Sequence, residues 1–170
     1  MTPRAAIIGL SGPRLTAEEA ALLRARRPVG AILFARNVAE PAQLRALTDE
    51  IRDILGAEAP ILVDQEGGRV ARLKPPQWER FPPAAAFEHA SEAALRANAE
   101  LLGRCCLGVG FDVVCAPVLD LRLPGAHGVI GDRAFSEDPA VIARLGAAFV
   151  AGLQAAGTIP VIKHIPGHGR

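Results

Sequence analysis

The stretch PILVDQEGGRVARL, residues 60–73, decides the fold because its character changes within a few residues. Its first half is apolar on both faces of an extended chain, which is typical of a strand buried in a parallel sheet. Its second half turns polar at Asp64, and Gly67 and Gly68 allow a tight turn and a close approach of the backbone to a ligand. We therefore expect a buried strand over 60–65 that ends in a carboxylate at the rim of a sheet.

Four further apolar runs and four helical patterns surround this strand. Apolar runs predict the other strands over residues 5–10, 29–34, 111–118 and 158–164. Helices are predicted over 16–26, from Pro41, from Ser91 and from Pro139, and Thr16 with Glu19 forms a capping-box pattern. The apolar stripes of the last three helices are Leu44, Leu47, Ile51 and Ile54; Leu95, Leu102, Cys106 and Val109; and Ile142, Leu145, Phe149 and Leu153.

Strand and helix therefore alternate four times before a fifth strand, and two architectures have this order. One is an open doubly wound sheet, which could be complete in 170 residues. The other is a TIM (β/α)8 barrel, which typically needs about 250 residues. This chain would supply about its first five strands and four helices. In both architectures, long loops after the third and fourth strands place chemistry at the carboxyl ends of the strands.

Composition argues against several classes of function. Half of the residues are hydrophobic and the net charge is +1, which suits one globular domain, and the basic residues are not clustered as nucleic-acid binding requires. No apolar run reaches the about 20 residues of a membrane span, and residues 1–10 do not resemble a secretory signal. Three cysteines, two of them adjacent, favour buried thiols over a disulfide framework or a zinc site.

Charged side chains follow three successive strands of the predicted sheet. Asp64 ends the third strand, Asp120 follows the fourth, and Lys163 and His164 end the fifth. The carboxyl ends of parallel strands share one edge, so we expect these side chains to gather there. Carboxylates, arginines and a lysine without metal-ligand spacing suit a polyhydroxylated ligand, because sugar hydroxyls both donate and accept hydrogen bonds.

Two of these residues have purely structural interpretations. Asp64 could be a rim carboxylate that pairs with Arg69. Arg133, in the long loop after the fourth strand, could reach a substrate oxygen or pair with Glu137 or Asp138. On the residue pattern alone both interpretations stay open.

The end of the fifth strand raises a separate question. Successive strand residues point to opposite faces, so only one of Lys163 and His164 would face a pocket unless the strand ends or twists there. His164 and His168 are four residues apart, which suits a metal on a helix. The intervening Pro166 and Gly167 forbid that helix, so we expect no metal site.

Three motifs together make the chain recognisable: VDQEGGRVARL (63–73), VIGDRAFSEDP (129–139) and KHIPGHG (163–169). With them the chain resembles family 3 glycoside hydrolases over essentially its whole length. It is most similar to the cytoplasmic bacterial β-N-acetylhexosaminidases that remove N-acetylglucosamine from peptidoglycan fragments during cell-wall recycling. The resemblance implies a TIM-barrel catalytic domain and retaining exo-hydrolysis through a covalent glycosyl-enzyme. It implies no cofactor and no nucleic-acid or membrane partner, only a small carbohydrate substrate.

The resemblance also assigns residues to the sugar site. Positions that match the N-acetylglucosamine-binding residues of the family are Asp64, Arg72, Arg133, Lys163 and His164. Asp64 would accept hydrogen bonds from sugar hydroxyls, and Arg133, Lys163 and His164 would donate to them. Asp120 and His168 are possible residues of the site rim. Two departures are Ile165, where phenylalanine is usual, and RLPGAH at 122–127, which is unlike the usual stretch after Asp120.

By the same resemblance the catalytic groups lie beyond residue 170. The family loop that begins with Pro-Gly-His-Gly continues into an Asp-Ser-His acid/base element, and the nucleophilic aspartate follows a later strand. We therefore expect residues 1–170 to be the N-terminal part of one family 3 barrel domain that stops after its fifth strand and is inactive alone. Two alternatives stay open: a non-catalytic sugar-binding module, and a complete small open-sheet α/β protein.

Overall fold

The strands of the computed structural model, which describes residues 2–168, form one parallel sheet. The strands are β1 (Arg4–Gly9), β2 (Pro28–Leu33), β3 (Ile61–Val63), β4 (Val113–Val114) and β5 (Ile159–Pro160). The helices between them are α1 (Ala17–Arg26), α2 (Pro41–Leu55), α3 (Glu92–Gly108) and α4 (Pro139–Ala156). Short 3-10 turns lie in the loops after β2, β3 and β4: η1 (Ala35–Asn37), η2 (Ala84–Phe87) and η3 (Gly131–Arg133).

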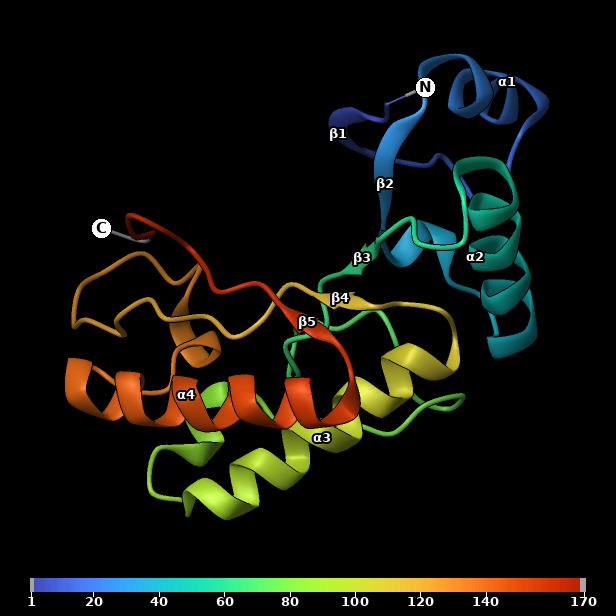
Figure 1. The fold of residues 1–170 in the computed structure, drawn as a ribbon. Coiled ribbons are helices and arrows are strands. Elements are labelled where there is room, and N and C mark those ends of the chain that lie inside the picture. Colours follow the sequence, from blue (N-terminus) through green and yellow to red (C-terminus); the bar gives the residue numbers. More distant parts are fainter. Residues whose placement is uncertain (1, 169–170) are drawn as a thin grey trace.

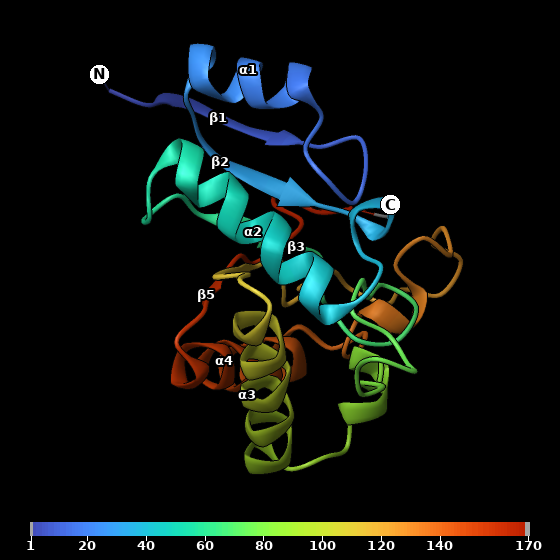
Figure 2. The same ribbon diagram turned by 90° about the vertical axis from the view of Figure 1, so that its right-hand side faces the viewer.

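The strand order decides between the two expected architectures. Each strand pairs in parallel with the strand before it in the chain, giving the order β1-β2-β3-β4-β5. A doubly wound sheet instead places its first strand inside and reverses direction at a switch point. The helices follow the curve of the sheet on its outer side (Figures 1 and 2). The chain therefore supplies five strands and four helices of a (β/α)8 barrel, and the open-sheet alternative is wrong.

The helix starts confirm the caps predicted at Thr16 and Ser91 and add one at Asp138. Thr16 and Glu19 form the reciprocal capping box of α1, with Glu19 N–H to Thr16 Oγ1 at 3.1 Å and Thr16 N–H to Glu19 Oε2 at 2.9 Å. Ser91 caps α3 and Asp138 caps α4 through their side-chain oxygens. Each cap satisfies backbone donors that the first helical turn leaves free, so these helices begin where the sequence predicts.

The core lies between the sheet and the inner faces of α2, α3 and α4. Every residue of the stripes predicted on α3 and α4 is buried, whereas on α2 Ile54 is only half-buried. Among the described residues α4 is the one helix long and apolar enough to span a membrane, with a mean hydropathy of 1.4. Its buried side packs along α3, as the core helix of a globular domain does.

Four strands differ from the predictions. β3, predicted over 60–65, is three residues long. β1, expected to be buried, is largely exposed, because among the described residues it pairs only with β2. The fourth and fifth strands, predicted over 111–118 and 158–164, are two residues each. Beyond them one isolated bridge joins Val118 to Lys163. The chain at the carboxyl edge is therefore irregular, which frees its side chains from strict alternation.

Candidate functional site

An interlocked set of ion pairs lies at the carboxyl edge of the sheet, where Asp64 follows the last residue of β3. The Asp64 carboxylate accepts from Lys163 Nζ at 2.8 Å and from Arg72 Nη2 at 3.2 Å. Lys163 Nζ also lies 2.6 Å from Glu66 Oε1. The loop after β3 and the segment after β5, 99 residues apart in the chain, thus meet as predicted.

Glu66 and Arg133 form the most buried pair of this set. Arg133 Nε donates to Glu66 Oε2 at 2.8 Å and Arg133 Nη2 to Oε1 at 2.9 Å, a bidentate geometry. Only 11% of the arginine side chain and 5% of the glutamate side chain are exposed. The hydrogen bonds to Glu66 raise the pKa of Arg133 above its usual value. Glu66 was not among the residues predicted from the sequence, although its place directly before the Gly-Gly turn is a local signal.

His164 is held by Asp120. His164 Nδ1 lies 2.6 Å from Asp120 Oδ2, and the backbone N–H groups of His164 and His168 donate to the same carboxylate at 3.2 and 2.6 Å. The Asp120 side chain is 1% exposed. An ionised carboxylate only accepts, so Nδ1 carries the hydrogen and Nε2 faces Arg133 Nη2 at 3.4 Å. Asp120 therefore orients the ring and holds the start of the loop that follows it.

The turn after Asp64 is built by its own residues. Gln65 Oε1 accepts the N–H groups of Arg72 at 2.7 Å and Leu73 at 3.0 Å, which closes the loop upon itself. Gly67 has a φ of +91°, and a Cβ there would lie 2.2 Å from the carbonyl oxygen of Pro82. The two glycines confirm the predicted tight turn, although the close approach is to the chain's own 81–83 segment.

The structure also shows which ion pairs Asp64 and Arg133 form. Asp64 does not pair with Arg69, which instead binds Asp132 at 2.9 Å. Arg133 pairs with Glu66 and not with the acidic residues that follow it in its own loop. Because β5 ends at Pro160, both Lys163 and His164 join the site, so the restriction to one of them does not apply.

The positive and negative charges of the site balance one another. Burial would raise the pKa of Asp64, but Lys163 and Arg72 outweigh burial and hold that pKa below its usual value. Asp64 and Glu66 pair with Arg72, Arg133 and Lys163, and Asp120 contacts His164, so three carboxylates and three cations lie in the site. A site with many donors and acceptors and no net charge suits a neutral polyol better than an anion or a metal ion.

The site has a cavity beside it and one buried donor without a partner. A cavity of about 450 Å³ opens beside it, lined by Asp120, His164, His168 and the apolar residues next to them. Arg72 Nε is buried and has no hydrogen-bond partner among the described residues. Buried polar groups are ordinarily paired, so this N–H is a donor that the described residues leave unsatisfied.

The (β/α)8 scaffold gathers these charged groups at the carboxyl ends of its strands, where the barrel enzymes of this architecture have their active sites. The family described as "Glycosyl hydrolase family 3 N terminal domain" matches residues 5–170. The chain belongs to glycoside hydrolase family 3. The resemblance deduced from the three motifs is thereby confirmed.

The chain is similar to proteins named beta-hexosaminidase. One from Alkalilimnicola ehrlichii is 44% identical over 170 residues, and one from Methylococcus capsulatus is 45% identical over 164. These matches cover 96% and 94% of this chain, and 48% of each relative. A crystal structure of NagZ from Neisseria gonorrhoeae in complex with N-trifluoroacetyl-D-glucosamine superposes with a TM-score of 0.92 at 35% identity. That superposition covers 98% of this chain and 51% of the other. The chain thus spans about half the length of the relatives it matches.

Proposed function

We propose that this chain forms the sugar-binding part of a retaining exo-β-N-acetylhexosaminidase. The enzyme would release N-acetylglucosamine from peptidoglycan-derived muropeptides in the cytoplasm, during cell-wall recycling. The observation that carries the proposal is the charge-balanced cluster of Asp64, Glu66, Arg133 and Lys163 at one rim of the barrel. The relatives named beta-hexosaminidase support the class of reaction.

The free hydrogen-bonding capacity of the cluster suggests how a sugar would bind. Lys163 has three N–H donors and uses two of them on Asp64 and Glu66, which leaves one for a hydroxyl. Asp64 has about four lone-pair positions, and it uses two for its cationic partners. Neutral His164 would present Nε2 as an acceptor, so the donor role expected for it requires a protonated ring.

The catalytic groups would come from outside residues 1–170. A retaining glycosidase needs a nucleophile and an acid/base beside the scissile bond. Each carboxylate of the described site is held by a cation or a histidine, and the resemblance to the family assigns Asp64 to sugar binding and the nucleophile to a later strand. Residues 1–170 alone would therefore bind sugar without cleaving it. Wild-type-like hydrolysis of a chromogenic N-acetylglucosaminide by purified residues 1–170 would show that a nucleophile lies within them.

Kinetics of the full-length protein test the sugar site. We expect Asp64→Ala to lower kcat/KM for a chromogenic N-acetylglucosaminide at least tenfold, a loss of about 1.4 kcal/mol in transition-state binding. The matched control is Asp49→Ala, which removes an exposed carboxylate paired with Arg45 on α2 and should leave kcat/KM unchanged. Unchanged kinetics in Asp64→Ala would remove that residue from the site. Sugar binding without turnover by the full-length wild type would instead favour the non-catalytic module.

A further inference from the structure

Two arginines link the turn after β3 to the loop before α4. Arg133 of the loop reaches back to Glu66, and Arg69 of the turn reaches forward to the segment 128–132. Arg69 Nε donates to Asp132 Oδ1 at 2.9 Å. Arg69 Nη2 donates to three backbone carbonyl oxygens at 3.1, 2.7 and 3.1 Å, those of Gly128, Val129 and Ile130. One guanidinium therefore collects four oxygens from a single short segment.

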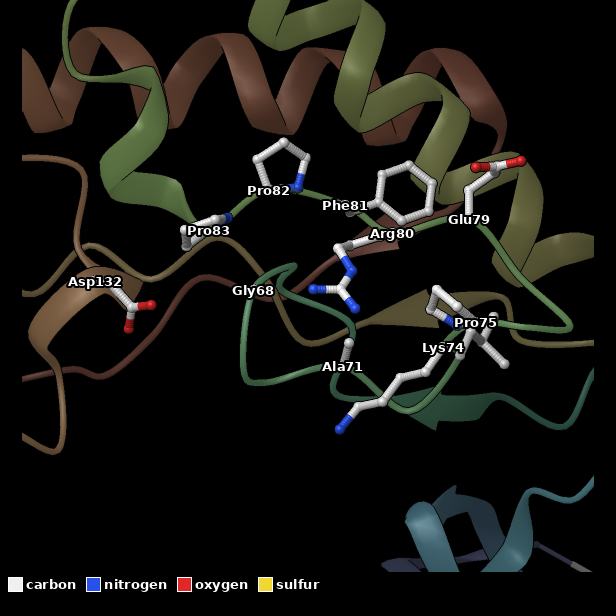
Figure 3. A pocket seen from close by; sticks show the side chains of 11 residues that line it. Gly68, Ala71, Lys74, Pro75, Glu79, Arg80, Phe81, Pro82, Pro83 and Asp132 are labelled. Carbon is white, nitrogen blue, oxygen red and sulfur yellow. The ribbon is translucent and has the colours of Figure 1, made fainter.

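The turn that carries Arg69 is a fixed base. The Gly68 N–H donates to the carbonyl oxygen of Phe81 at 2.8 Å, and a Cβ on Gly68 would lie 2.7 Å from the Cβ of Pro83. Figure 3 shows this turn with Pro83 beside it, and Asp132 on η3 across the open space. The turn is therefore held by its own neighbours, and Arg69 extends from it to the loop.

The segment that Arg69 holds belongs to the long irregular loop between β4 and α4. Its short 3-10 turn, η3, ends at Arg133. The buried apolar cluster beside this loop is small and consists of Val118, Ile130 and Ala134. Carbonyl oxygens only accept hydrogen bonds, so three of them that converge on one place need a shared donor. The planar fork of Arg69 supplies several N–H groups at once, which a compact ammonium group would not do in the same geometry.

One carbonyl group connects the two arginines. The oxygen of Val129 accepts from Arg69 Nη2 at 2.7 Å and from Arg133 Nη1 at 3.1 Å, which uses both of its lone pairs. Nε and Nη2 of Arg133 face Glu66 and His164. Of its five N–H groups, one on Nη1 therefore has no partner among the described residues. The Val129 carbonyl, with Glu66, fixes the direction of that N–H.

We propose that Arg69 is a positioning residue of the sugar site, which acts by fixing the segment that carries Arg133. The inference rests on the proposed function, since a sugar hydroxyl is the partner proposed for the remaining Nη1 N–H of Arg133. Arg69 acts through Arg133 and needs no contact with the sugar, because its four hydrogen bonds hold the protein segment 128–132. Without Arg69 the three carbonyls would turn toward water, and the Arg133 guanidinium would lose its contact with Val129.

A double-mutant cycle in the full-length protein tests this role. We expect Arg69→Gln to raise the inhibition constant of N-acetylglucosamine and to lower kcat/KM for a chromogenic N-acetylglucosaminide. Each change should be about tenfold, the scale of one lost hydrogen bond to a charged group. In an Arg133→Lys background the same substitution should change either constant by less than about twofold, the ordinary error of additivity. The inhibition constant does not depend on the amount of folded protein, so a general loss of stability leaves it unchanged.

Two substitutions serve as controls. Asp132→Asn removes the charge of the exposed ion pair and keeps an oxygen for Arg69, so its effect on either constant should stay within about twofold. Arg104→Gln removes an arginine that is 64% exposed on α3 and should leave both constants at their wild-type values. Equal losses for Asp132→Asn and Arg69→Gln would contradict the inference, because the surface ion pair and not the carbonyl contacts would then hold the segment.

An unchanged inhibition constant in Arg69→Gln, or the same tenfold change in both backgrounds, would overturn the positioning role. If Arg69→Gln unfolds at the assay temperature, Arg69→Lys, which keeps the charge without the fork, takes its place in the cycle with the same outcomes. A wild type that binds N-acetylglucosamine without cleaving its glycosides would overturn the glycosidase function alone, and dissociation constants of N-acetylglucosamine then complete the cycle. A wild type that does not bind this sugar would overturn the sugar site and the role of Arg69 with it.

Discussion

The ion pairs at the rim of the sheet and those on the helix surfaces use the same side chains in opposite settings. Glu66 and Arg133 are 5% and 11% exposed, whereas Arg45 and Asp49 on α2 are 53% and 51% exposed. The rim pairs join segments far apart in the chain, and the helix pairs join residues one turn apart. Water solvates the helix pairs on most sides, but the protein itself must satisfy the rim pairs.

This difference indicates what each set does. Exposed ion pairs contribute about 0 to 1 kcal/mol to stability, and an i,i+4 pair lies at the low end. Burying charges is costly, and apolar residues of the same volume would often be as stable. A cluster of buried charges that packing does not require is therefore best explained by what it binds. Substitutions in the rim pairs and in the helix pairs should therefore differ in their effect on the free energy of unfolding.

The largest loss of stability is expected from Arg133→Ala. Glu66 would lose both hydrogen bonds to the guanidinium and keep only Lys163, which it shares with Asp64. A buried carboxylate left short of partners costs about 3 kcal/mol in the free energy of unfolding, the lower end of the range for broken buried pairs. Urea unfolding measures the change. A loss below about 1 kcal/mol would place this pair with the surface pairs.

A smaller loss, with a marked pH dependence, is expected from Lys163→Gln. Each carboxylate would keep an arginine, so the expected loss is about 2 kcal/mol at neutral pH. The lowered pKa of Asp64 means that its ionised contacts stabilise the fold above the ordinary value of 3.8 and are lost only as the pH falls through the lowered value. Without Lys163, burial raises that pKa, so acid destabilisation begins at higher pH.

Melting temperatures between about pH 3 and pH 6, the range around carboxylate titration, measure this shift. Lys74→Gln is the control, because Lys74 is the other lysine of the chain and makes no contact with Asp64. We expect its acid limb to superpose on that of the wild type. If the acid limb of Lys163→Gln also stays in place, Lys163 does not set the ionisation of Asp64.

Much of the fold and part of the candidate site could be predicted from the sequence. Periodicity and caps located the helices because each depends on a few neighbouring residues, as at Thr16 and Ser91. The residues that follow the third and fifth strands met as expected, because parallel strands share a carboxyl edge. The sequential strand order was the point that periodicity left open, since a local pattern does not say which strands are neighbours.

The features that could not be predicted depend on contacts between residues far apart in the chain. Glu66 was not considered, since its partners Arg133 and Lys163 are 67 and 97 residues away. The lengths of β3, β4 and β5 were overestimated, because the apolar runs continue past the regular strands into an irregular rim, where an isolated bridge joins Val118 to Lys163. The role of Asp120 in orienting His164 was equally hidden, since both were known only as strand-end residues.

Asp120→Asn is expected to lower the free energy of unfolding by about 1 to 2 kcal/mol, because the amide keeps the shape of the side chain and one acceptor oxygen. The carboxylate now accepts three hydrogen bonds from His164 and His168, and an amide nitrogen in its place would face an N–H instead of accepting it. Stability and kcat/KM should both fall, the latter because the His164 ring loses its orientation. A variant as stable and as active as the wild type would show that the ring is held by other groups.

The smallest effect is expected from Arg104→Ala on α3. Its contact with Glu100, at 2.6 Å, is as short as any in the rim cluster, but 64% of the arginine side chain is exposed. If distance alone decided the energy of an ion pair, this substitution would cost as much as Arg133→Ala. Solvation decides it, so the loss should be about 0.3 to 0.5 kcal/mol, as for other i,i+4 pairs. Raising the salt concentration should remove most of the stability loss of Arg104→Ala. The loss of Arg133→Ala should persist, because buried charges are screened much less. Equal losses for the two arginines in urea unfolding would contradict the contrast between rim and helix surface.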